Sequence, residues 1–330
     1  MMPHALAPLT VMILLSAAAG GVCAQGTRPV DVAGWIGRMA ESAGRLNYSG
    51  IYVYQTAGRV ETMRVTHLVD NTGEYEKIAS LDGPAREVVR HNDQIRCYLP
   101  DARTVRVDRL RTKRFFPALL ENSGNLSDGY AATIEGTDRV AGYECQVVLL
   151  QPKDNLRFAH RFCADIGTGL MLRASTLNDR REMIEQFTFT EVRLGGRIGR
   201  DELKPTFADR QKSWQTDDSA IQQTPAGNTG WDVKGLPAGF RKIVETRRAI
   251  DDTETPVVHQ IYSDGLAAVS VFIRANGADG SQGAGPIRHG RHPMYVRTLP
   301  DQPYTVTVLG EVPEASLERI ANSLALSPAR

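Results

Sequence analysis

Residues 81–107 read LDGPAREVVRHNDQIRCYLPDARTVRV, and this stretch decides the class of fold. Short runs rich in Val, Ile and Tyr are separated by clusters of Gly, Pro, Asn and Asp, the residues that favour turns. The runs at 86–90, 94–99 and 103–108 are too short for helices and have the composition of strands. The stretch therefore predicts an antiparallel meander.

Comparable strand patterns continue on both sides of the meander. An amphipathic helix is expected at 29–43. Strand-like runs separated by turn residues follow at 47–55, 60–69, 74–80, 133–140, 143–150, 157–164, 170–177 and 183–194. Strands at a spacing of roughly 8 to 12 residues after one helix are typical of an antiparallel sheet curled into a barrel or half-barrel. We expect the helix to cap or plug that sheet.

The composition changes at 205–230, where the sequence is polar and has few aliphatic residues, so a linker is expected. Residues 231–330 then predict a second, smaller α+β unit, with a hairpin turn at Asp264-Gly265 and a closing helix at 313–324. A chain of 330 residues is long enough for two domains. The expected organisation is a half-barrel domain at 25–204, the linker and the C-terminal domain.

Residues 1–24 contain no Lys, Arg, Asp or Glu, and 9–19 form an apolar core of the length found in signal peptides. Small residues precede Gln25, so cleavage is expected there and the mature protein is expected to be exported. The alternative is a lipoprotein cleavage at Cys23, but the residues before Cys23 fit a lipobox poorly. No later stretch approaches the ~20 apolar residues that a membrane-spanning helix needs.

Three cysteines follow the leader, Cys97, Cys145 and Cys163, and an odd number leaves one of them outside any intramolecular disulfide. Cys97 and Cys145 both lie in expected strands of the half-barrel domain. We expect a disulfide between these two that contributes about 3 to 4 kcal/mol. The alternative is that all three are small buried side chains.

The sequence contains none of the short motifs that mark serine hydrolases, zinc proteases, P-loop enzymes or Cys-x-x-Cys oxidoreductases. His160 and Cys163 would point to opposite faces of a strand, which argues against a shared metal ion. The 39 basic and 38 acidic residues nearly balance, so there is no overall attraction to nucleic acid. We therefore expect a binding protein rather than an enzyme, with no catalytic residues, metal or cofactor.

Residues 103–114 hold six cations, and apolar side chains follow them directly. A cationic rim beside apolar groups suits an amphiphile with an anionic headgroup, or an acidic partner segment. The alternative is a solvated strand face beside ordinary core residues. The inner face of a curled sheet is likewise either a site for acyl chains or a core filled by side chains. The residues expected to contact an amphiphile are Arg111, Arg114, Phe115, Phe116 and Leu119.

Several longer strings resemble the RseB/MucB family. They are LNYSGIYVYQ (46–55), LDGPAREV (81–88), GTDRVAGYECQV (136–147), LNDRREMIEQFTFTE (177–191), QIYSDGLAAVSVFI (260–273) and VLGEVPEASLERIANSL (308–324). The resemblance implies an unclosed β-barrel domain similar to the lipoprotein carriers LolA and LolB, followed by a smaller C-terminal domain. It also implies a negative regulator of sigma-E, the envelope-stress sigma factor. Such regulators bind the periplasmic part of a membrane-spanning anti-sigma factor and shield it from regulated proteolysis, until amphiphiles such as lipopolysaccharide or mislocalised lipoproteins release it.

The family offers no short catalytic motif, so the partner surface is assigned from this chain alone. The residues expected to meet the anti-sigma factor are Arg86, Arg90, Tyr262, Asp264 and Leu266. The alternative function is a periplasmic lipid or lipoprotein carrier of the LolA type, which would need no second domain behind a linker. The sequence does not decide whether the chain forms a homodimer.

Overall fold

The computed structural model describes residues 31–108, 116–117, 119–120, 126–218, 224–225, 227–248, 257–276, 285–289, 292–299 and 302–326. The expected leader, and Arg111, Arg114 and Phe115 of the basic run, lie outside these residues. No helix within the described ranges is both long and apolar enough to cross a membrane.

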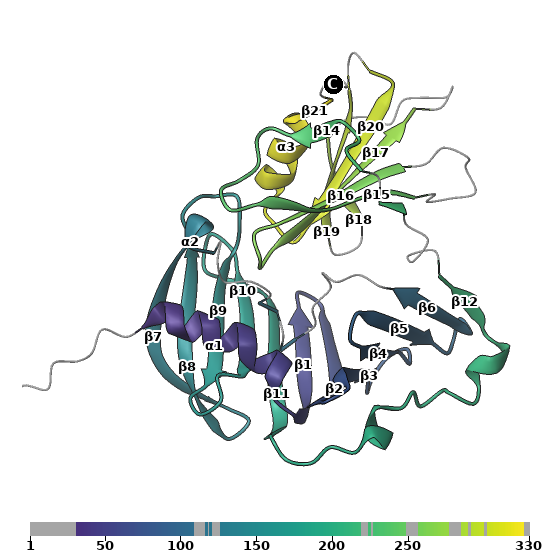
Figure 1. Cartoon of the computed structure of the whole chain (residues 1–330). Helices are drawn as coiled ribbons and strands as arrows, with labels where there is room; N and C mark the ends of the chain where they lie inside the picture. Colours follow the sequence, from purple (N-terminus) through teal and green to yellow (C-terminus); the bar gives the residue numbers. More distant parts are fainter. Residues whose placement is uncertain are drawn as a thin grey trace, which may run out of the picture. The chain divides into compact units, whose positions relative to one another are not determined.

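Helix α1 (Val32–Arg45) opens the described chain, in agreement with the amphipathic pattern. The Asp31 carboxylate caps it by accepting a hydrogen bond from the Gly34 amide at 2.8 Å, which satisfies one of the free amides of the first turn. The apolar side chains of Ile36, Met39 and Ala43 are buried in the core of the large sheet. Figure 1 shows the helix crossing the strands β7 to β11.

The large sheet has twelve strands in the order β12-β6-β5-β4-β3-β2-β1-β11-β10-β9-β8-β7. Its strands are β1 (Tyr48–Thr56), β2 (Arg59–Asp70), β3 (Gly73–Ser80), β4 (Glu87–His91), β5 (Gln94–Leu99), β6 (Thr104–Asp108), β7 (Tyr130–Val140), β8 (Tyr143–Pro152), β9 (Ala159–Asp165), β10 (Met171–Leu177), β11 (Met183–Leu194) and β12 (Gln215–Asp217).

Two antiparallel meanders make up this sheet, and β1 joins them by pairing with both β2 and β11. The meander expected at 81–107 is β4, β5 and β6, and it is confirmed. The terminal strands β7 and β12 lie at opposite ends of the strand order, so the sheet is unclosed, as predicted. Alternation along the strands sends one set of side chains to the inner face, where α1 and the core lie.

Aromatic side chains fill part of the inner face. Phe116 packs against Tyr52, Phe187 and Phe189, with ring centroids 5.0 to 5.5 Å apart. Aromatic pairs at such distances contribute about 0.5 to 1.5 kcal/mol each beyond their area burial. In the region of Phe116 the inner face is therefore a packed core.

The segment after β11 lies against the outer face of β3 to β6. The buried Glu87 carboxylate accepts hydrogen bonds from the amide and hydroxyl of Thr206, at 2.8 and 2.7 Å. Phe207 and Trp214 pack against the core cluster of Tyr98, and β12 then pairs in parallel with β6. The first part of the polar stretch 205–230 is thus ordered, because two aromatic rings and one strand edge suffice to hold a segment that composition alone marks as a linker.

The disulfide of the described chain joins Cys145 of β8 to Cys163 of β9, whose Cα atoms are 5.3 Å apart. The predicted bridge between Cys97 and Cys145 is therefore wrong. Cys97 lies on β5, at the other end of the strand order from β8, whereas a disulfide needs Cα atoms within ~7 Å. Neighbouring strands of a meander bring Cys145 and Cys163 together, although they are 18 residues apart.

A smaller domain follows, built on a seven-stranded sheet in the order β13-β15-β16-β17-β20-β19-β18. Its elements are β13 (Thr224–Pro225), β14 (Trp231–Val233), β15 (Arg241–Arg248), β16 (Val257–Ser263), β17 (Ala268–Ala275), β18 (Gly285–His289), β19 (His292–Thr298), β20 (Tyr304–Gly310), α3 (Glu314–Asn322) and β21 (Leu324–Leu326). The predicted hairpin at Asp264-Gly265 joins β16 to β17 and is confirmed. Helix α3 covers one face with buried Leu317 and Ile320. In the N-terminal domain, a short helix α2 (Leu126–Gly129) precedes β7 of the large sheet.

Candidate functional site

Arg157, in the loop between β8 and β9, connects the large sheet to the C-terminal domain. Its fully buried guanidinium donates from Nη1 to Asp264 Oδ2 at 2.9 Å, and from Nη2 to the Ala238 carbonyl at 2.7 Å. Both carboxylate oxygens of Asp154, in the same loop, accept from Nε and Nη2 at 3.1 Å. One side chain therefore holds residues from two parts of the chain that are 107 positions apart.

The surroundings of Arg157 are shaped for this guanidinium. Its Cζ lies 5.3 Å from the ring centroid of Tyr130 and 5.4 Å from that of Phe240, distances at which a cation is attracted to an aromatic face. A Cβ atom at Gly129 would lie only 1.8 Å from Arg157 Nη1. Only glycine therefore fits at position 129 without displacing the arginine.

Asp264 serves both the turn and the ion pair. Its Oδ1 accepts from the amides of Leu266 and Ala267 at 3.0 and 2.9 Å, which fixes the β16–β17 turn, and its Oδ2 faces Arg157. Burial raises the pKa of Asp264, while these amides and Arg157 act in the opposite direction. Breaking a buried pair by removing one partner costs about 3 to 5 kcal/mol, since the remaining charge is left without compensation.

A cavity of about 950 Å³ lies beside this ion pair. Strand ends of the large sheet contribute Tyr54, His160 and Glu185 to its walls, and the C-terminal domain contributes Leu266 and Val312. The volume is within the ~300 to 1,000 Å³ common for ligand sites in proteins. The cavity is thus large enough to receive side chains of a binding partner.

His160 of β9 is one of the titratable groups that line the cavity from the large sheet. Burial lowers its pKa to about 4, so the imidazole is neutral at neutral pH. Its Nδ1 lies 3.4 Å from Thr176 Oγ1, and its buried Nε2 has no hydrogen-bond partner among the described residues. Across the described ranges, no three His, Cys, Asp or Glu side chains are grouped as a metal site would require.

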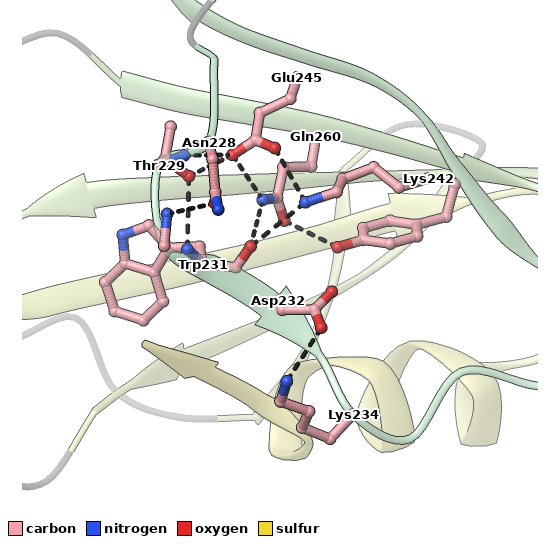
Figure 2. A network of polar contacts seen from close by, with 10 residues as sticks. Asn228, Thr229, Trp231, Asp232, Lys234, Lys242, Glu245 and Gln260 are labelled. Carbon is pink, nitrogen blue, oxygen red and sulfur yellow. Dashed lines mark hydrogen bonds and ion pairs between the residues drawn. The ribbon is translucent and has the colours of Figure 1, made fainter. Parts of the chain in front are cut away.

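Of the residues expected to meet the anti-sigma factor, Tyr262 and Asp264 are fully buried. The Tyr262 hydroxyl donates to Gln260 Oε1 at 2.9 Å, and Gln260 in turn donates to the Trp231 carbonyl. Figure 2 shows this network around Gln260 and Glu245, which binds the segment before β14 to β15 and β16. Tyr262 and Asp264 therefore support the surface rather than form it.

The other expected partner residues differ in exposure. Arg90 is buried between Glu74 and Glu76, with which it forms ion pairs, whereas Arg86 keeps a partly exposed guanidinium beside Glu61. Leu266 is partly buried against the core of the large sheet and lines the cavity. The structure thus places Leu266 in the cavity wall and Asp264 in the ion pair beside it, whereas Arg86 and Arg90 do not line the cavity.

The described part of the expected amphiphile site is the pair Phe116 and Leu119. Phe116 is buried among the inner-face aromatics, and Leu119 is packed against the same core. No sequence motif pointed to Arg157 or Asp154, and His160 was considered only as a metal ligand and rejected. An Asp-x-x-Arg spacing in a turn was the signal present, but such spacing is common in solvated loops.

Comparisons with known proteins agree over both domains. A model of the MucB/RseB N-terminal domain matches residues 31–207, and a model of the MucB/RseB C-terminal domain matches residues 225–325. The sigma factor AlgU regulatory protein MucB of Pseudomonas aeruginosa is 29% identical over 313 residues, which are 90% of this chain and 92% of that protein. The sigma-E factor regulatory protein RseB of Escherichia coli K12 is 24% identical over 290 residues, which are 86% of this chain and 87% of that protein.

Solved structures give the same answer. The complex structure of Pseudomonas aeruginosa MucA/MucB contains a chain that is 28% identical, with a TM-score of 0.74 over 91% of this chain and 100% of that one. A crystal structure of MucB is 27% identical, with a TM-score of 0.62 over 90% of this chain and 98% of that one. Since the two family models together span nearly all of the described sequence, the chain belongs to the MucB/RseB family.

Proposed function

We propose that this protein is a periplasmic regulator that binds the periplasmic part of an anti-sigma factor and so restrains an envelope-stress sigma factor. The observation that carries the proposal is the match to MucB in complex with MucA, which covers 100% of the MucB chain at a TM-score of 0.74. The curated relatives that match over most of their length are named as sigma factor regulatory proteins.

The site supports binding rather than chemistry. Arg157 and Asp264 hold the β16–β17 turn against the loop between β8 and β9, so a partner would meet a surface that is already formed. Preorganised surfaces lose less conformational entropy on binding. In this proposal Leu266 and the cavity form part of the partner surface, and Tyr262 and Asp264 act as its buried supports. Arg86, which is partly exposed beside Glu61, would meet the partner at a separate place, and Arg90 acts as a buried support there.

Shielding from proteolysis and release by amphiphiles are the finer parts of the proposal. An acyl chain that entered the inner face would have to displace Phe116 from Tyr52, Phe187 and Phe189. A ligand shifts a binding equilibrium only if it prefers one state, and a hundredfold release needs about 2.8 kcal/mol of such preference. Burial of a few methylene groups, at about 0.8 kcal/mol each, is sufficient.

The test is an in vitro reconstitution with the mature chain, residues 25–330, and the periplasmic segment of the anti-sigma factor from the same organism. We expect a complex by calorimetry, slower cleavage of the segment by the initiating protease, and dissociation when lipopolysaccharide micelles are added. Micelles of a neutral detergent serve as the control. Absence of a complex would contradict the proposal, and recovery of lipids or lipoproteins alone would favour a carrier of the LolA type.

Location and assembly are tested with the same material. We propose that residues 1–24 direct export to the periplasm and that Gln25 begins the mature chain; mass spectrometry of the periplasmic fraction measures both. Light scattering at several concentrations determines whether the mature chain dimerises. A mass that includes an acyl group at Cys23 would identify a lipoprotein instead.

A further inference from the structure

The cavity beside Arg157 carries an excess of negative charge. Its lining includes the carboxylates of Asp154, Asp179, Glu185, Glu311 and Glu314, against the single guanidinium of Arg157. Asp154 and Asp264 already compensate that guanidinium. Asp179, Glu185 and Glu314 therefore give the cavity a net negative potential, which low-dielectric walls concentrate.

Two buried polar atoms in the lining are unsatisfied within the described chain. Gln151 Oε1 is a hydrogen-bond acceptor, and His160 Nε2 belongs to a neutral imidazole that adds no positive charge. A buried polar atom without a partner costs about 1 to 3 kcal/mol, so such atoms normally bind water or a ligand group. Gln151 Oε1 can receive an N–H donor from a ligand in the cavity.

Apolar groups line the same cavity. Tyr54 and Ile184 face it from the large sheet, and Leu266, Val312 and Pro313 face it from the C-terminal domain. Walls of this kind suit the aliphatic stems of Lys and Arg, which bury their methylene groups while their charged ends meet polar partners. An anionic lipid headgroup would instead meet carboxylates of like charge.

We propose that this cavity binds an extended basic segment of the protein partner, whose Lys or Arg side chains meet Asp179, Glu185 and Glu314. The inference rests on the proposed function, because it identifies the anti-sigma factor as the source of that segment. It also separates two ligands: the basic protein segment enters the cavity, whereas an amphiphile would act at the inner face near Phe116.

The test compares three forms of the mature chain: the natural sequence, the triple variant Asp179→Asn, Glu185→Gln, Glu314→Gln, and the control Glu144→Gln. Glu144 is an exposed carboxylate of β8 outside the cavity lining. Two ligands are titrated at low and high salt: the periplasmic anti-sigma segment, and a fluorescein-labelled octapeptide of alternating Arg and Leu. An octapeptide of alternating Glu and Leu controls for apolar binding, and thermal melting of each variant controls for folding.

We expect the triple variant to bind the anti-sigma segment and the Arg-Leu peptide at least tenfold more weakly at low salt. The control should bind both normally, and the difference should shrink at high salt because ions screen the charges. If the triple variant binds the anti-sigma segment normally, the inference is overturned while the proposed function stands. If the natural chain binds no anti-sigma segment, the proposed function fails. If the proposed function fails in this way, the peptides still test the cavity. Loss of Arg-Leu binding in the triple variant would support a cation site, whereas a natural chain that binds the Glu-Leu peptide as tightly as the Arg-Leu peptide would exclude one.

Discussion

Two buried arginines in this chain have the same chemistry but different structural roles. Arg157 lies between Asp154 and Asp264, and Arg90 lies between Glu74 and Glu76. The carboxylates around Arg90 come from the adjacent strand β3, whereas Asp264 comes from a separate domain. The Arg90 cluster therefore fixes the interior of one sheet, and the Arg157 cluster fixes one domain against another.

His67 joins the Arg90 cluster. Its Nδ1 lies 2.8 Å from the Leu46 carbonyl oxygen, and its Nε2 lies 3.0 Å from Glu74 Oε1. Tyr48 stacks on the imidazole, with the ring centroids 4.7 Å apart. The Arg90 cluster therefore links side chains of the four neighbouring strands β1 to β4, whereas the Arg157 cluster links the loop between β8 and β9 to the β16–β17 turn.

The largest effect is expected from Arg90→Ala. This variant removes the guanidinium that forms ion pairs with Glu74 and Glu76, so we expect a loss of about 3 to 5 kcal/mol in the free energy of unfolding. Urea denaturation followed by circular dichroism measures it. Arg64→Ala, which removes an exposed arginine from the neighbouring strand β2, is the control and should change stability by less than about 0.5 kcal/mol. Equal effects in the two variants would show that burial does not distinguish them.

Asp264→Asn should cost about 3 kcal/mol, at the lower end for a broken buried pair. The side-chain oxygen of asparagine can still accept hydrogen bonds from the backbone amides of Leu266 and Ala267, but asparagine lacks the charge that faces Arg157. We expect the loss to appear as separate unfolding of the two domains, seen as two calorimetric transitions, and as faster proteolysis between them. Asp232→Asn, at an exposed ion pair with Lys234, is the control. A single unchanged transition in Asp264→Asn would show that the pair does not couple the domains.

Acidification acts on the Arg90 cluster through Glu74. Burial acts to raise the pKa of Glu74, but hydrogen bonds from His67 and Arg90 outweigh it and lower the pKa from 4.5 to about 2. The stability that Glu74 contributes is complete above pH 4.5 and is lost as the pH falls towards 2.

Between pH 5 and pH 2.5 we therefore expect Glu74 to contribute a loss of about 1 to 2 kcal/mol, since the full shift is worth roughly 3 kcal/mol and part of it is screened. Glu74→Gln should flatten this part of the profile. Denaturation of both chains at a series of pH values measures the two profiles, and a Glu74→Gln profile parallel to that of the natural chain would contradict the assignment.

The sequence predicted one class of feature well and another poorly. Period-two patterns and turn residues identified the strands β1 to β11 of the large sheet and the hairpin at Asp264-Gly265, because those signals are local. They did not identify β12, which lies in the stretch expected as a linker. The disulfide and the Arg157 cluster were missed or misassigned, because each depends on which distant segments become neighbours. Asp264 was selected as a surface residue for the partner, and only the packing of Arg157 shows that it is buried.

The smallest effect is expected from Arg106→Ala, which removes an exposed ion pair to Asp217 in β12. The two charged atoms are 3.4 Å apart, and the arginine side chain is 66% exposed, so water and salt screen the pair. Exposed ion pairs contribute about 0 to 1 kcal/mol, and we expect a loss below about 0.5 kcal/mol in urea denaturation. Trp214→Ala is the informative counterpart, because it removes a ring packed against the core cluster on the outer face of the same sheet. A substantial loss in Trp214→Ala with none in Arg106→Ala would show that packing, and not charge, holds this segment to the sheet. The reverse outcome would show that the exposed ion pair, and not packing, holds it.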